Sequence, residues 1–118
     1  MTPFGEKLRE MRRERNIRQK DMAKSLGVSS AYLSALEHGR RGRPSWALLQ
    51  QIIGYFNIIW DEAEELQKLA AISHPRVVID TAGLDPSATY LANILANRIN
   101  HLKLDDIEAL IERLKRAD

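Results

Sequence analysis

The sequence predicts an all-α protein in which five helices are followed by a linker and a C-terminal two-helix extension. Three observations predict this fold class: apolar residues recur at helical spacing, capping residues precede these segments, and glycine or proline ends several of them. The chain has 118 residues, the length of one domain or of a small domain with an appendage. We expect helices over about residues 3–15, 19–26, 30–38, 46–56 and 60–73, then one that starts at residue 86 and a last one over about 104–116.

Short polar residues and glycine predict where these helices begin and end. Thr2 is followed by Pro3, a pair that can cap and start the first helix. Gly27 should end the second helix because glycine tolerates a positive φ, and Ser29 can cap the third. Asp85 is placed to cap the first helix of the C-terminal extension.

The chain divides where the helical pattern breaks at a His-Pro pair. Residues 1–74 should form one helical domain, residues 75–84 a linker, and residues 85–118 a C-terminal helical element. Within the linker, the β-branched run at 77–79 predicts a short strand.

Positive charge is concentrated in the N-terminal part of the chain. Residues 1–43 hold 11 Lys and Arg against 5 Asp and Glu, a net charge of +6, whereas residues 44–118 hold 7 against 11, a net charge of −4. This asymmetry favours a polyanionic partner for residues 1–43 only. Scattered basic residues also solvate helix faces, so charge alone does not decide for nucleic acid.

Several functional classes find no support in the sequence. The chain has no cysteine, and therefore no disulfide or thiolate metal site. It has neither a signal-like start nor an apolar run of the roughly 20 residues that a membrane span needs, so we expect a cytoplasmic protein without a membrane partner. Because it also lacks a nucleophile motif and a glycine-rich phosphate loop, we expect no enzymatic activity and no cofactor.

The histidines and tryptophans receive structural interpretations. His38, His74 and His101 do not have the spacing of metal ligands, and we expect no metal site. Trp46 and Trp60 are expected in the hydrophobic core. Two acidic clusters mimic paired catalytic acids, but they stand at predicted helix starts, where negative charge is favourable.

One segment carries a recognisable motif. Residues 19–39 contain two short helices joined by a tight turn at Gly27, with the small Ala23 where the two helices should cross. This pattern predicts a helix-turn-helix, whose second helix lies in the major groove of DNA and reads bases with its N-terminal half. The residues expected on the outer, base-facing side of that helix are Ser30, Ala31, Ser34 and Ala35.

Residues 4–60 resemble the Cro/CI family of bacterial and phage transcriptional regulators, also called XRE-like. The matching residues are Gly5, Leu8, Arg9, Arg12, Gln19, Ala23, Gly27, Val28, Ser29, Leu33, Ser34, Glu37, Gly39 and Pro44. The resemblance implies a repressor-like five-helix DNA-binding domain over residues 1–74. It also implies a sequence-specific transcriptional regulator, a repressor that binds a two-fold symmetric double-stranded operator as a dimer.

The resemblance carries over to individual positions. It implies that Gln19 holds a phosphate and braces the recognition helix, and that Arg12 and Glu37 form a partly buried ion pair between the first and third helices. The residues that it places in contact with phosphate, or beside the base-facing positions, are Gln19, Tyr32, Arg40, Arg41 and Arg43.

Two departures from the family pattern change what is expected of this site. The family usually has Thr or Ser before the glutamine, whereas Arg18 has no capping oxygen; it can reach a phosphate instead, with a cap weaker by about 1 kcal/mol. The base-facing residues are unusually small, and Ser and Ala cannot make bidentate pairs with bases. We therefore expect readout through thymine methyl groups, water and DNA shape.

The C-terminal extension is predicted to hold a homodimer together. Its two helices carry apolar faces that two short helices cannot bury completely against each other, so we expect a partner surface. The alternative, in which the extension folds back and completes the core of the first domain, stays open. The residues expected at the dimer interface are Leu91, Ile94, Leu95, Ile99, Leu102, Ile107, Leu110, Ile111 and Leu114.

Other functions stay compatible with the same motif. An antitoxin would bind its operator through this domain and neutralise a toxin through a second surface. A pure interaction module would bind an acidic protein through the basic face, and DNA binding with a steep salt dependence would exclude it. RNA binding is disfavoured because the sequence lacks the exposed aromatic platforms that single-strand readers use.

Overall fold

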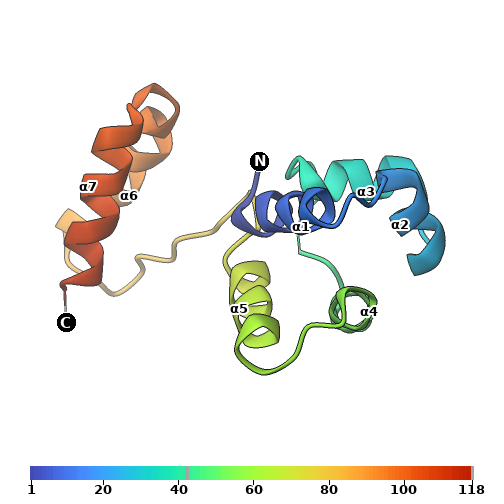
Figure 1. Cartoon of the computed structure of the whole chain (residues 1–118). Coiled ribbons are helices and arrows are strands. Elements are labelled where there is room, and N and C mark those ends of the chain that lie inside the picture. Colours follow the sequence, from blue (N-terminus) through green and yellow to red (C-terminus); the bar gives the residue numbers. More distant parts are fainter. Residues whose placement is uncertain (42, 118) are drawn as a thin grey trace. The chain divides into compact units, whose positions relative to one another are not determined.

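The protein folds into helices only, in the residues that its computed structural model describes, 1–41 and 43–117 (Figure 1). This confirms the predicted all-α class. The chain separates into two units, Met1–Val77 and Val78–Asp118. The first contains α1 (Pro3–Glu14), α2 (Gln19–Leu26), α3 (Ser30–Glu37), α4 (Trp46–Phe56) and α5 (Trp60–Ala71). The second contains α6 (Pro86–Arg98), the short 3₁₀ helix η1 (Ile99–His101) and α7 (Leu104–Lys115).

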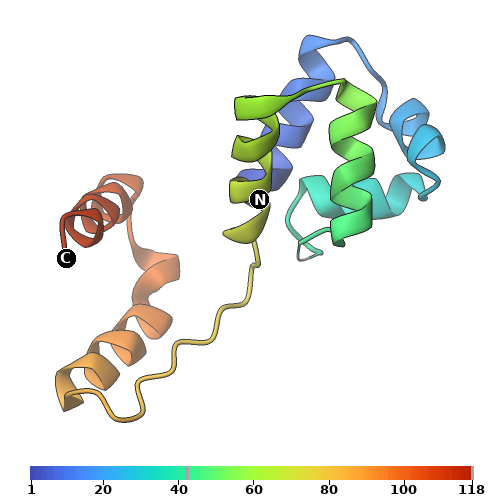
Figure 2. The same ribbon diagram turned by 90° about the horizontal axis from the view of Figure 1, so that it is seen from below.

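The core of the first unit is built from one apolar face of each of its five helices. Helix α1 packs against α3 and α5, and α2 packs against α3 and α4 (Figure 2). The pair α2–α3 is therefore supported by α1 and α4, which both also contact α5. The apolar side chains in this core are Phe4, Leu8, Met11, Met22, Ala23, Leu26, Leu33, Leu36, Leu48, Leu49, Ile52, Phe56, Ile58, Leu66 and Ala70. Most of these residues recur at helical spacing along the chain, the pattern from which the helices were predicted.

The turn between α2 and α3 has the geometry that its sequence predicts. Gly27 adopts a left-handed conformation with φ of 72°, and the Val28 amide donates to the Ala23 carbonyl at 3.0 Å. Two residues later, the Ser29 hydroxyl accepts a hydrogen bond from the Tyr32 amide at 3.0 Å and caps α3. Helix α3 therefore starts at a defined residue and in a defined direction.

Hydrogen bonds tie the two ends of the first unit together. The Phe4 amide, in the first turn of α1, donates to the Ser73 hydroxyl at 2.9 Å. The same hydroxyl donates to the Leu69 carbonyl at the end of α5. Ser73 is buried, although nothing in the sequence pattern distinguishes it from a solvent-exposed serine.

The prediction that both tryptophans lie in the core is wrong. Trp46 is 67% exposed and Trp60 is 82% exposed. Each is the first residue of its helix. Trp46 lies outside the buried face of α4 that contains Leu48 and Ile52. Trp60 also has a left-handed backbone with φ of 54°, a conformation that bulky residues rarely adopt.

The second unit is a pair of helices joined through η1, preceded by an extended segment. Asp85 caps α6 by accepting a hydrogen bond from the Ser87 amide at 2.9 Å, which holds the pKa of this exposed carboxyl below its usual value. The short strand expected at 77–79 is absent from the described chain, because no neighbouring strand pairs with this exposed segment. No described helix is long and apolar enough to cross a membrane.

Candidate nucleic-acid interface

Helix α3 presents small side chains outward and large ones inward. Ser30 and Ala31, in its first turn, are exposed, while Leu33 and Leu36 are buried on the opposite side. Further along, Ser34 and Ala35 are half-buried. The face of α3 formed by Ser30, Ala31, Ser34 and Ala35 therefore carries only small side chains, with the half-buried Tyr32 beside it, and another surface can approach the helix backbone closely there.

A buried carboxylate holds α3 against the helices behind it. Glu37 is fully buried and accepts hydrogen bonds from Arg12 Nε at 2.9 Å and from Arg12 Nη2 at 3.1 Å. Gln19 Nε2 donates to the same carboxylate at 3.2 Å. Because Arg12 lies on α1 and Gln19 on α2, three helices meet at one charged group, and the bidentate geometry restricts how α3 can rotate or slide.

The Arg12 guanidinium also fixes the loop between α1 and α2. Its Nη1 donates to the Ile17 carbonyl at 3.1 Å. The burial of Glu37 is thus matched by hydrogen bonds to both carboxylate oxygens, the condition under which a buried charge is tolerated. The structure places Gln19 next to α3, in a position to brace it.

Arg18 stands at the N-cap of α2, where its side chain makes no capping hydrogen bond. Its Nε donates instead to Asp21 Oδ2 at 3.1 Å, and both side chains are exposed. An ion pair at such exposed positions is weak, and a phosphate can compete with Asp21 for the guanidinium.

The loop after α3 carries three exposed arginines, and its first two residues are hydrogen-bonded to the helix. The amides of Arg40 and Arg41 both donate to the Ala35 carbonyl, at 2.9 and 3.3 Å. The Arg41 guanidinium lies over the Tyr32 ring, 5.7 Å from its centroid, a cation–π contact that links the loop to α3. Arg40, Arg41 and Arg43 are all exposed, so the loop presents their charge to solvent.

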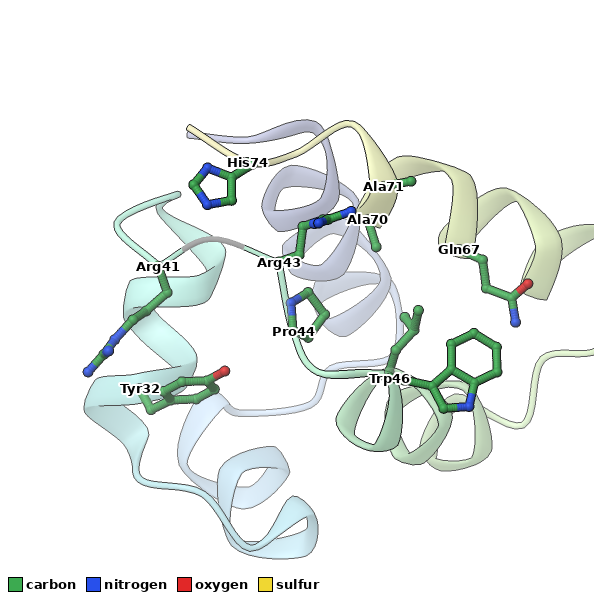
Figure 3. A pocket seen from close by; sticks show the side chains of 10 residues that line it. Tyr32, Arg41, Arg43, Pro44, Trp46, Gln67, Ala70, Ala71 and His74 are labelled. Atoms are coloured by element: carbon green, nitrogen blue, oxygen red, sulfur yellow. The ribbon is translucent and has the colours of Figure 1, made fainter. Parts of the chain in front are cut away.

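A groove of about 750 Å³ opens beside this loop. Arg41, Arg43 and Trp46 line it, together with Gln67 from α5 and His74 from the segment after it. In Figure 3 the Trp46 ring and the Gln67 side chain lie near each other, whereas the Arg41 guanidinium points to the left of the view. The structure thus places an exposed tryptophan at the start of α4, next to the arginine loop.

The exposure of Trp46 was not predicted, although its place at the start of a helix was. The Ser45 hydroxyl accepts a hydrogen bond from the Leu48 amide at 3.2 Å and makes Trp46 the first residue of α4, as the predicted helix over residues 46–56 requires. A first-turn residue has no preceding turn of the same helix to pack against, and periodicity alone does not place it. Among the described residues, no cluster of His, Asp or Glu has the arrangement of a metal site.

Comparison with known families identifies the fold that carries this interface. A family described as the helix-turn-helix domain matches residues 3–66, more than half of the chain. The chain belongs to this helix-turn-helix family. The matched segment contains α1 through α4 and most of α5, and it includes every residue of the Arg12–Glu37–Gln19 network.

Individual relatives include HTH-type transcriptional regulators of bacteria and a phage control-region protein, which agrees with the XRE-like resemblance. The uncharacterised HTH-type transcriptional regulator RghRB of Bacillus subtilis is 27% identical over 93% of this chain and 87% of its own length. The HTH-type transcriptional repressor RghR of the same bacterium is 40% identical over 44% of this chain and 38% of its own. The ImmF control region 10 kDa protein of Bacillus phage phi105 is 39% identical over 47% of this chain and 60% of its own.

Proposed function

We propose that this helix-turn-helix protein is a transcriptional regulator that binds a specific double-stranded DNA operator and represses transcription. The observation that carries the proposal is the exposed first turn of α3, whose outer face has only small side chains. Hydrogen bonds from Arg12 and Gln19 to Glu37 hold this helix in place, and a loop with three exposed arginines follows it. The names of the relatives, a regulator and a repressor among them, support a role in transcription.

In this proposal the two parts of the surface have separate tasks. Ser30, Ala31, Ser34 and Ala35 face the base edges in the major groove, where small side chains favour contacts with thymine methyl groups, bridging water and close approach. The arginines of the loop, with Arg18, Gln19 and Tyr32, contact or flank the phosphates and set the register of α3 in the groove. Arg12 and Glu37 act behind the interface by holding α3 in place.

The decisive test is the substitution Ala31→Glu in the exposed first turn of α3. It adds bulk and negative charge where DNA should lie, so we expect operator binding to be lost while the circular dichroism spectrum and melting temperature stay unchanged. Ala109→Glu is the matched control, since it makes the same chemical change at an exposed position of α7. Normal operator affinity in a folded Ala31→Glu protein would show that DNA does not bind this face.

We also propose that the protein binds a two-fold symmetric operator as a homodimer. Two recognition helices would then lie about 34 Å apart, one turn of DNA, on successive major grooves. Residues 85–118 supply the interface in this proposal, through Leu91, Ile94, Leu95, Ile99, Leu102, Ile107, Leu110, Ile111 and Leu114. Six of these side chains are 41–66% exposed, and Leu95, Leu102 and Ile107 are half-buried.

Truncation tests the dimer independently of DNA. A chain that ends at Val77 keeps all five helices of the first unit, and we expect it to stay folded but monomeric in light scattering. The full chain should be a dimer under the same conditions. If the truncated chain dimerises at the same concentration as the full chain, the interface belongs to the first unit.

A further inference from the structure

The second unit has no core of its own. Within the described residues 78–117 no side chain is buried, and the large apolar side chains that are even half-buried are Leu95, Leu102 and Ile107. Folded units of about 40 residues usually need a disulfide, a metal ion or association with another chain. The chain has no cysteine, and among the described residues no group of His, Asp and Glu is arranged to hold a metal ion, so association is the route that fits this unit.

Helix α7 carries an exposed apolar stripe along one face. Ile107, Leu110, Ile111 and Leu114 recur at helical spacing, and the last three are 45%, 45% and 66% exposed. A continuous apolar stripe of this kind on a small protein marks an interaction surface.

Charged residues border this stripe in a repeated order. Asp106 and Arg113 lie along one edge, and Glu108 and Lys115 lie along the other. In each pair the acid precedes the base by seven residues, which is two helical turns and therefore the same edge. All four side chains are exposed, and within the described chain none of them has an ion-pair partner.

We propose that α7 pairs antiparallel with α7 of a second copy of this chain, about a two-fold axis near Leu110 and Ile111. Asp106 then faces Arg113 of the second copy, and Glu108 faces its Lys115, while the apolar stripes meet between them. The midpoint of the first pair falls between Ala109 and Leu110 and that of the second between Ile111 and Glu112, and the proposed axis lies between these two points. The inference rests on the homodimer of the proposed function and specifies how that dimer is built.

The order of charges selects this arrangement over its alternatives. In a parallel pair the opposite edges of the two stripes meet, so Asp106 would lie near Glu108 of the second copy and Arg113 near its Lys115, which is repulsive at both ends. The helix dipole favours acids at the start and bases at the end, but it does not require them to border the apolar stripe. Asp105 and Arg116 follow the dipole as well, yet helical spacing places them on the opposite face.

Charge reversal in the full chain tests the proposal. Asp106→Arg and Arg113→Asp each convert two symmetry-related attractive pairs into repulsive ones, and we expect each to raise the dimer dissociation constant about tenfold. The double variant Asp106→Arg/Arg113→Asp exchanges the charges and should restore the dimer. Asp105→Arg and Arg116→Asp are the matched controls, with the same charge changes on the other face and little expected effect on association.

Sedimentation equilibrium gives the dissociation constants, and circular dichroism checks that each variant keeps its helices. If the single variants dimerise like the wild type, or if the double variant fails to regain affinity, the antiparallel pairing is overturned although the dimer stands. A wild-type chain that stays monomeric overturns the dimer itself. Operator binding by α3 is measured separately and does not depend on this result.

Cross-linking reports the direction of the pairing. Because the chain has no cysteine, Asp106→Cys and Arg113→Cys introduce single thiols. When two tagged chains are coexpressed, we expect oxidation to link the Cys at 106 of one to the Cys at 113 of the other. Efficient linking of the Cys at 106 of one chain to a Cys introduced at Glu108 of the other would instead indicate a parallel pair, in which the opposite edges meet.

Discussion

At the scale of single residues, Gly5 determines how closely α1 and α3 approach each other. A Cβ atom added at this position would lie 2.4 Å from the Glu37 carbonyl oxygen and 2.7 Å from that of Leu36. These neighbours are backbone atoms, which cannot move aside as the end of a flexible side chain can. The short distance therefore brings the end of α3 close to α1, where Arg12 reaches Glu37.

We expect Gly5→Ala to lower the free energy of unfolding by about 1–3 kcal/mol, as overpacking does, even though alanine favours helices. Gly54→Ala is the control: it lies inside α4 with open space around the added methyl group, and should raise stability by roughly 0.5–1 kcal/mol. Urea denaturation measures both. Equal effects of the two substitutions would contradict the close contact between α1 and α3.

The Arg12–Glu37 pair makes a second prediction at this scale. Replacing Arg12 by Met leaves the buried Glu37 carboxylate without its main partner, and we expect a loss of about 3–5 kcal/mol. The double variant Arg12→Met/Glu37→Leu removes both charges and should cost less than the single variant. A double-mutant cycle in urea measures the coupling, and strictly additive effects would show that the two charges do not depend on each other.

At the level of helices, α2 starts after Arg18 without a side-chain cap. We expect this residue to lower the stability of the fold while it strengthens DNA binding. Ser29, Ser45 and Thr2 each cap their helices with a hydroxyl, whereas Arg18 makes no such hydrogen bond. In the proposed complex the Arg18 guanidinium reaches a phosphate, which a serine cannot do.

Arg18→Ser should therefore raise the free energy of unfolding by about 1 kcal/mol, because serine supplies the missing cap. The same variant should bind its operator more weakly and with a shallower salt dependence. Arg18→Ala separates the two effects, since it removes the charge without adding a cap: we expect the loss of affinity alone. Thermal melts and fluorescence titrations check the pair, and an Arg18→Ser protein that binds as tightly as the wild type would remove Arg18 from the interface.

At the scale of the whole molecule, positive charge gathers in the part of the chain that contains α3 and its loop. The +6 of residues 1–43 is set against −4 in the remainder. A polyanion should therefore bind through the first unit, with counterion release as a large part of the affinity.

Replacing Arg40, Arg41 and Arg43 by Ala should flatten the plot of log K against log salt by up to about 0.9 for each phosphate that the loop no longer neutralises. Affinity should fall alike for specific and unrelated DNA, because binding to phosphates carries no sequence information. As a control, Arg98, Lys103 and Arg116 in the second unit can be replaced together. An unchanged slope in the loop variant, or an equal change in the control, would contradict phosphate binding by the loop.

The positions of the helices and of most of their ends can be predicted from the local sequence. Thr2, Gly27, Ser29 and Asp85 act on amides or dihedral angles within a few residues, so their effect can be predicted from the local sequence alone. The all-helical class follows from the same periodicity. The base-facing residues of α3 and the C-terminal interface stay predictions, since both concern surfaces that meet another molecule.

The burial of residues at the helix starts, and the contacts between distant segments, depend instead on how the helices pack together. The Phe4–Ser73 hydrogen bond joins positions that are 69 residues apart, and the exposure of Trp46 and Trp60 depends on the direction in which α4 and α5 leave their caps. Periodicity identifies an apolar face of a helix, but a residue in the first turn can point inward or outward according to how the helices cross. That crossing is set by the summed packing of all five helices, which no local pattern contains.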